Sequence, residues 1–213
     1  MEPMALQGVR VVDLSWIVAG PTCTRVLADF GAEVIKVESR EVMDYIRGAP
    51  PFAEGRPGVE RSGFFNNLNR NKLGVTLNVA HPRGMELLRR LIAVSDVVVE
   101  NFSSRVLERW GLDYEGQRRL RPDGVYCSLS GFGHSGRHRD YTTWGPTAQA
   151  LSGVTFMSGL PGHEPAGWGF SYLDHNAGYY AAMAILMALH HRWRTGRGQW
   201  IDIAQVETGI AVT

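Results

Sequence analysis

The chain has 213 residues, of which 44% are hydrophobic, so it can bury one substantial core and is expected to form one domain. Its 22 lysines and arginines balance 21 acidic residues, which excludes the basic field that attracts nucleic acids and anionic membranes. The two cysteines are too few for a disulfide framework, and no signal peptide or membrane-length apolar run is evident, so the expected compartment is a reducing cytoplasm. Neither the cysteines nor the seven histidines have metal-ligand spacing, and we expect no metal site.

The first forty residues predict a strand, a helix and a second strand. The β-branched run at 9–14 is typical of a buried strand, and 19–22 indicates a break in the chain. A helix is predicted over 24–30 and ends at Gly31, and 32–38 predicts the second strand. This βαβ unit favours a parallel sheet with a right-handed crossover.

The segment 39–71 is rich in glycine, proline, asparagine and charge without a sustained period, so it predicts a long surface loop. Alternation then resumes, with strands predicted at 74–79, 96–101 and 124–130, a helix from about 81 to 94, and one or two helices over 106–119. The predicted fold class is therefore α/β, with a Rossmann-like, mostly parallel sheet flanked by helices. In such sheets ligands lie beyond the carboxyl ends of the strands, here Trp16–Ala19, Ser39–Arg40, Asn78, Asn101–Phe102 and Gly131 onward.

A long helix is predicted to start at Asp174. No proline follows Asp174, and alanine, leucine and methionine dominate as far as Leu189, which indicates about five turns. The helix is apolar almost all round, so we expect it to be buried. A carboxylate at this helix start is either an N-cap or a nucleophile at the mouth of a cleft, and its position alone does not choose between them.

Two familiar catalytic motifs are not supported by their context. Gly131–Gly136 has the spacing of a dinucleotide fingerprint and follows a predicted strand. That fingerprint needs a helix at its last glycine, whereas Arg137–Tyr141, followed by Gly145–Pro146, has the composition of a loop. A GxSxG elbow is absent, and Ser128 and Ser130 lie within a strand pattern, so a serine nucleophile is not expected either.

Several ordered blocks point instead to one family. They are GVRVVD at 8–13 with AGP at 19–21, DFGAEVIKVE at 29–38, NRNK at 69–72, VENF at 99–102, SLSGFG at 128–133 and RTGRGQ at 194–199. Together they resemble the class III CoA-transferases, which include the formyl-CoA, carnitine and bile-acid CoA-transferases and the related α-methylacyl-CoA racemases. The resemblance runs from about Gly8 to Gly209, nearly the whole chain.

The resemblance implies a role for each matching position. Asp174 corresponds to the family's catalytic aspartate, which attacks an acyl-CoA thioester to give a mixed anhydride and then an aspartyl-CoA thioester. It further implies that Arg40 and Arg109 meet the phosphates and adenine of CoA, although both would otherwise be interpreted as solvated surface arginines. The CoA contacts implied by the match are Val18, Ala19, Arg40, Leu77, Asn78, Asn101, Phe102, Arg109, Thr142 and Trp144.

Departures from the family pattern narrow the expected activity. Formyl-CoA transferase has glutamine in place of Val18 and a lysine, tyrosine and glutamate across 142–145, so formate and oxalate are not the expected substrates. The racemases have a histidine where Trp144 aligns, so a transferase is favoured over a racemase. The aromatic and apolar residues around the site suggest a larger or more apolar acyl group than formate.

The resemblance also bears on domain organisation and partners. Family members are longer, with a small second domain and a return to the large domain, and their two subunits interlock. We therefore expect residues 1–213 to be the N-terminal part of a Rossmann-like, CoA-binding large domain, completed by a second copy or a partner chain. CoA is expected as part of the substrate, alongside a carboxylic acid, with no resident cofactor. A truncated CoA-binding subunit without activity is the non-enzyme alternative.

Overall fold

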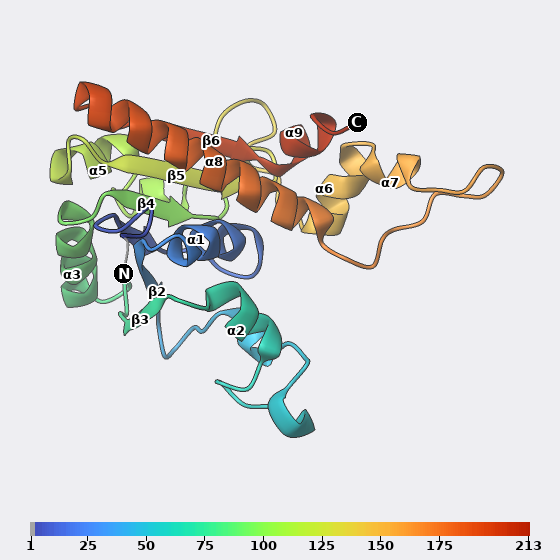
Figure 1. Ribbon diagram of the computed structural model, residues 1–213, viewed down its shortest axis with the longest axis horizontal. Coiled ribbons are helices and arrows are strands. Elements are labelled where there is room, and N and C mark those ends of the chain that lie inside the picture. Colours follow the sequence, from blue (N-terminus) through green and yellow to red (C-terminus); the bar gives the residue numbers. More distant parts are fainter. Residues whose placement is uncertain (1–2) are drawn as a thin grey trace.

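Six parallel strands form the centre of the computed structural model, which describes residues 3–213 (Figure 1). In the order β3-β2-β1-β4-β5-β6 they span Leu73–Thr76, Glu33–Glu38, Arg10–Asp13, Val97–Glu100, Val125–Ser130 and Trp200–Ala204. All five neighbouring pairs are parallel, so the predicted α/β class and Rossmann-like sheet are confirmed. The chain moves outward in one direction from β1 to β3 and in the other from β4 to β6, so the order reverses between β1 and β4.

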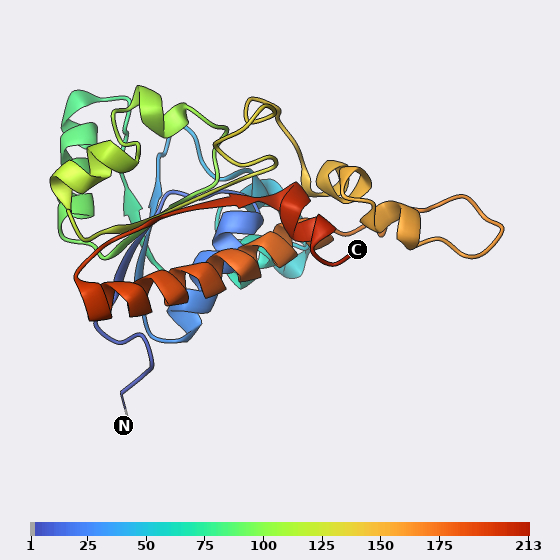
Figure 2. The same cartoon turned by 90° about the horizontal axis from the view of Figure 1, so that it is seen from above.

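Helices cover both faces of this sheet, as Figures 1 and 2 show. One face is covered by α1 (Ala19–Asp29) and α8 (Tyr172–Thr195), and the other by α3 (Pro82–Ala93), α4 (Val106–Arg109) and α5 (Tyr114–Leu120). Successive strand residues point to opposite faces, so Val11 packs in the core beneath α1 and α8 while Val12 packs beneath α3. Each face therefore has its own hydrophobic core.

The prediction of a loop over 39–71 is wrong for its second half, which contains the helix α2 (Gly63–Asn69). The first half contains two short 3₁₀ turns, η1 (Tyr45–Gly48) and η2 (Ala53–Gly55). Ser62 caps α2 by accepting a hydrogen bond from the Phe65 N–H. The helix is too short to show a hydrophobic period, and its stability comes from burial of Phe65 and Leu68 against Val18.

Two helices contain proline in their first turn, where the sequence predicted a break or a loop. Helix α1 begins at Ala19 rather than after Thr22, with Pro21 as its third residue. Helix α6 (Gly145–Leu151) begins with Gly145 followed by Pro146, and a further turn, α7 (Val154–Met157), comes after it. Proline is tolerated at these positions because its missing N–H would have no partner within the helix.

Helix α8 is longer and more exposed than predicted. It spans 24 residues, and its inward face is built by small and branched residues such as Ala181 and Ile185. The expectation that it is buried all round is wrong, because Met183 and Met187 are 51% and 72% exposed on the opposite side. The short helix α9 (Gln205–Ile210) follows β6 and packs against α8 and α6. Within residues 3–213, no helix has the length and apolar character needed to cross a membrane.

Candidate active site

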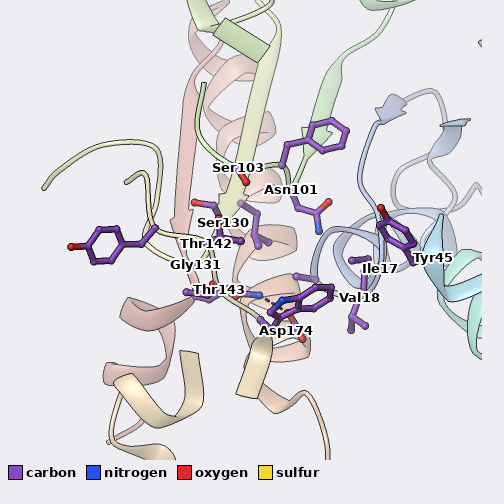
Figure 3. A pocket seen from close by; sticks show the side chains of 16 residues that line it. Ile17, Val18, Tyr45, Asn101, Ser103, Ser130, Gly131, Thr142, Thr143 and Asp174 are labelled. Atoms are coloured by element: carbon purple, nitrogen blue, oxygen red, sulfur yellow. Dashed lines mark hydrogen bonds between the residues drawn. The ribbon is translucent and has the colours of Figure 1, made fainter. Parts of the chain in front are cut away.

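A cavity of about 480 Å³ opens at the carboxyl ends of β1, β4 and β5, where the strand order reverses. This is the place where open parallel sheets bind ligands. Figure 3 shows Ile17, Val18 and Tyr45 on one side of the cavity, Thr142 and Thr143 on the other, and Asp174 between them. The remaining lining residues are Ala19, Asn101, Phe102, Ser103, Leu129, Ser130, Gly131, Tyr141, Trp144 and Gln205.

Asp174 is the single carboxylate among the described residues that line this cavity. It lies in the first turn of α8, whose N-cap residue is Ser171, so the interpretation of Asp174 as the N-cap is wrong. Its Oδ1 instead accepts a hydrogen bond of 2.6 Å from Nε2 of Gln205. Burial raises the pKa of the Asp174 carboxyl above its ordinary value, and hydrogen bonds from Gln205 and Ser171 oppose that rise.

Two glycines allow neighbouring elements to come close to this carboxylate. A Cβ atom on Gly145, at the start of α6, would lie 2.2 Å from Oδ2 of Asp174. A Cβ atom on Gly178, one turn further along α8, would lie 2.6 Å from the carbonyl oxygen of Ala19. Both distances are far shorter than a van der Waals contact, so only glycine permits this packing. The missing side chains thus set the distances from α8 to α6 and to α1.

The loop after β1 is held in an unusual conformation. Ile17 has φ = 68°, which is rare for a β-branched residue. Its N–H donates to the Asp44 carboxylate, 3.1 Å to Oδ1, and that carboxylate also pairs with Lys36 Nζ at 3.1 Å. The Asn101 side chain forms a second clamp, since its Oδ1 accepts from Trp16 N–H at 2.7 Å and its Nδ2 donates to the Trp16 carbonyl at 2.8 Å. These contacts fix the cavity wall that continues into Val18.

Behind this loop, the buried Asp13 carboxylate connects β1 to α1 and to the loop before β3. It accepts hydrogen bonds from Lys72 Nζ at 2.9 Å, from Thr24 Oγ1 at 2.7 Å and from the Ser15 N–H at 2.9 Å. Burial alone would raise its pKa, but Lys72, Lys36 and these hydrogen bonds lower it to about 2. The carboxylate therefore stays ionised and anchors the start of α1.

Glu100, at the end of β4, anchors the opposite wall. Its Oε2 accepts from the Phe102 N–H at 2.8 Å, and its Oε1 accepts from the Tyr126 hydroxyl at 2.9 Å and lies 3.2 Å from His134 Nε2. Burial lowers the pKa of His134, but hydrogen bonds and charges of Asp202 and Glu100 outweigh it and raise that pKa to about 9. The charged His134 imidazole thus connects the loop after β5 to Glu100 of β4 and to Asp202 of β6.

Most of the predicted site residues come together, although two arginines do not. Asp174 lines the cavity together with the predicted CoA contacts Val18, Ala19, Asn101, Phe102, Thr142 and Trp144. A second cavity of about 280 Å³, beyond the ends of β2 and β3, contains Leu77 and Asn78 and shares Phe102 with the first. Arg40 and Arg109 are exposed and line neither cavity.

Gln205 is the site residue that sequence reasoning missed. It is the first residue of α9, directly after β6, and it is 31 residues from Asp174 in the sequence. The signal that could have indicated it is its place at the carboxyl end of a strand, the same criterion that selected Asn78 and Asn101.

Comparison with known proteins gives a consistent result. The family model described as CoA-transferase family III matches residues 6–213. The succinate–glutarate CoA-transferase of Agrobacterium fabrum is 40% identical over 209 residues, which cover 97% of this chain and 52% of that protein. The succinyl-CoA–D-citramalate CoA-transferase of Chloroflexus aurantiacus is 39% identical over 211 residues, which cover 99% of this chain and 51% of that protein.

Solved structures agree with these sequence relatives. The crystal structure of a CAIB/BAIF family protein from Brucella suis superposes with a TM-score of 0.92 and 38% identity, over 99% of this chain and 56% of that chain. The crystal structure of Rv3272 from M. tuberculosis superposes with a TM-score of 0.87 and 30% identity, over 99% of this chain and 56% of that chain. The chain spans about half the length of the curated relatives it matches.

Proposed function

Because the chain belongs to CoA-transferase family III, we propose that it provides the nucleophile and a large part of the CoA site of an enzyme that moves CoA from an acyl-CoA thioester to a carboxylic acid. One observation carries the proposal. Among the described residues, Asp174 is the only carboxylate lining the cavity at the point where the strand order reverses. A carboxylate in that position meets the requirement for covalent catalysis on an activated acyl group.

The proposed reaction proceeds through covalent intermediates on Asp174. Its carboxylate attacks the thioester carbonyl, forms a mixed anhydride and releases the CoA thiolate. The thiolate attacks the aspartyl carbonyl, forms an aspartyl-CoA thioester and releases the donor acid. The acceptor carboxylate then attacks that thioester, releases the CoA thiolate and forms a second mixed anhydride. The thiolate attacks the acceptor carbonyl of this anhydride, which gives the new acyl-CoA and frees the Asp174 carboxylate. Each intermediate keeps one carbonyl activated, so water must be kept out of the cavity.

CoA would bridge the two cavities that share Phe102. Its thioester end would lie in the larger cavity beside Asp174, and its nucleotide end in the smaller one beside Leu77 and Asn78. The exposed Arg40 and Arg109 are free to turn toward the phosphates and adenine, since a guanidinium both pairs with phosphate and stacks on a base. CoA takes part as substrate, and the proposed chemistry requires no resident cofactor.

The residues that line the larger cavity support a transferase over a racemase. A two-base racemase needs a second proton acceptor opposite Asp174, and the described lining includes neither a histidine nor a second carboxylate. Trp144, the position at which the sequence resemblance places the racemase histidine, also lines the cavity. We further propose that residues 1–213 belong to a large domain that is completed by further chain or by a second subunit, because the matched relatives are about twice as long.

Trapping of the covalent intermediate tests the proposal. Two matched relatives are named for succinate or succinyl-CoA, so succinyl-CoA is the first donor to use and glutarate the first acceptor. Hydroxylamine or borohydride should label the wild-type protein at Asp174 and leave Asp174→Asn unlabelled. The variant should lose transfer activity by more than about 10³-fold. Glu164→Gln changes an exposed carboxylate in the segment before α8 and is the matched control, which should be labelled like the wild type.

The same experiment identifies the alternatives. Exchange of the α-proton of an acyl-CoA without labelling of Asp174 would show a racemase. Binding of CoA with neither labelling nor exchange would show a CoA-binding subunit without transferase activity. Either result contradicts the proposed function.

A further inference from the structure

The two oxygens of the Asp174 carboxylate have different surroundings. Oδ1 accepts the 2.6 Å hydrogen bond from Gln205 Nε2, drawn as the dashed line in Figure 3. Oδ2 lies close to the backbone of Gly145, where a Cβ atom would be only 2.2 Å away. The hydrogen bond from Gln205 thus distinguishes the two oxygens. Oδ1 stays on its donor, and Oδ2 is the oxygen left to bond to the acyl group.

Gln205 is well placed to keep this arrangement. Its side chain is only 5% exposed, and it begins α9, which packs against α8. A donor buried in this way is preorganised and needs no rearrangement when charge develops on its partner. In addition, Gln205 lines the cavity, so it adjoins the place where the reaction would occur.

We propose that Gln205 Nε2 is the oxyanion donor for the second covalent step, in which CoA attacks the aspartyl carbonyl. The inference rests on the proposed function. In the first step Oδ2 bonds to the acyl carbon and Oδ1 becomes the carbonyl oxygen of the aspartyl group. The CoA thiolate then donates its electron pair to Cγ of Asp174, and the π pair of the Cγ–Oδ1 bond moves onto Oδ1. When that pair returns, the Cγ–Oδ2 bond breaks and the donor acid leaves as a carboxylate.

This role is specific to one kind of step. Negative charge grows on Oδ1 when the aspartyl carbonyl is attacked, so the Gln205 hydrogen bond strengthens in that transition state. When Asp174 itself attacks the substrate, charge leaves the carboxylate, and the same hydrogen bond gives no assistance. Removal of one preorganised oxyanion donor lowers a rate by about 10²–10³-fold. Loss of Gln205 should therefore slow the second step and spare the first.

The test follows both steps in a single turnover without acceptor. Wild-type protein and Gln205→Met are mixed with succinyl-CoA and quenched with acid at successive times. The free CoA thiol in each quenched sample is then assayed with a thiol reagent, and the CoA adduct of Asp174 is measured by mass spectrometry. Gln205→Met should release CoA thiol at the wild-type rate but form the CoA adduct about 10²–10³-fold more slowly. Gln205→Leu also lacks the amide donor and places no second charge beside Asp174, and it should show the same selective slowing.

A second buried glutamine provides the matched control. Gln149 is 2% exposed, and its Oε1 accepts a hydrogen bond from the N–H of Tyr172 at the start of α8, whereas the donor to Asp174 Oδ1 is Gln205. Gln149→Met should leave the ratio of the two rates unchanged. The inference is overturned if Gln205→Met and Gln205→Leu form the CoA adduct at the wild-type rate, or if both steps slow equally. Absence of both thiol release and adduct in the wild type would instead refute the proposed function.

Discussion

Replacing Asp44 with alanine should destabilise the protein by about 3–5 kcal/mol, the cost of breaking a buried ion pair. The side chains of Lys36 and Asp44 are 3% and 0% exposed, and their charged atoms lie 3.1 Å apart. Without the carboxylate the ammonium group loses its ion pair and keeps its 2.7 Å hydrogen bond to the Ser15 carbonyl and its attraction to Asp13. The N–H groups of Ile17 and Ile46 lose their acceptor as well.

Urea unfolding and thermal melting measure this cost. For a chain of this size, 3–5 kcal/mol corresponds to a fall in melting temperature of about 6–20 °C. The matched control is Glu54→Ala, which removes an ion pair with Arg61 whose side chains are 76% and 35% exposed. That change should cost less than about 1 kcal/mol. If Asp44→Ala unfolds within about 1 kcal/mol of the wild type, Lys36 does not depend on this pair and the reasoning is wrong.

Two further predictions concern the site and its support. Gly145→Ala should lower kcat about 10²-fold, because the new Cβ atom would lie 2.2 Å from Asp174 Oδ2 and displace the carboxylate, whereas Gly74→Ala meets no atom within 4 Å and should retain wild-type activity. Because the pKa of His134 is raised to about 9 in the folded protein, its protonated imidazole contributes stability that is fully present below pH 6.5. This contribution is lost as the pH rises through about 9, so the melting temperature should fall less between pH 6.5 and 9 in His134→Gln than in the wild type. An unchanged kcat in Gly145→Ala would contradict the first prediction. An equal fall in melting temperature in His134→Gln and the wild type would contradict the second.

The predicted sheet is accurate because its signals are local. β1, β2 and β4 are runs of four to six residues rich in β-branched residues, β5 combines Val125 with the aromatic Tyr126, and turns or helices with their own glycine, proline or amphipathic pattern follow these strands. The carboxyl-end rule selects Val18, Asn101 and Gly131, which line the larger cavity, although it also selects Arg40, which lines neither cavity.

The failures have physical causes that a local pattern does not contain. Pro21 and Pro146 suggested breaks, although the missing N–H of proline costs nothing in a first helical turn. The outer face of α8 is apolar yet exposed, because composition does not say which sides of a helix receive partners. The contact between Gln205 and Asp174 depends on the placement of α9 beside α8, which arises only when the sheet is complete.

Gly178 has a consequence for how substrate preference changes in such an enzyme. The absence of a side chain at Gly178 lets α8 pack closely against α1 in the hydrophobic core, so the position of Asp174 is determined by packing on the side away from solvent. Tyr45, Tyr141 and Trp144 lie at the opposite, open side and are 69%, 61% and 62% exposed. Replacement of these aromatic side chains would reshape the entrance while Asp174, the proposed nucleophile, keeps its place. In the proposed enzyme, selectivity and reactivity would thereby be separated in space, and one could evolve without loss of the other.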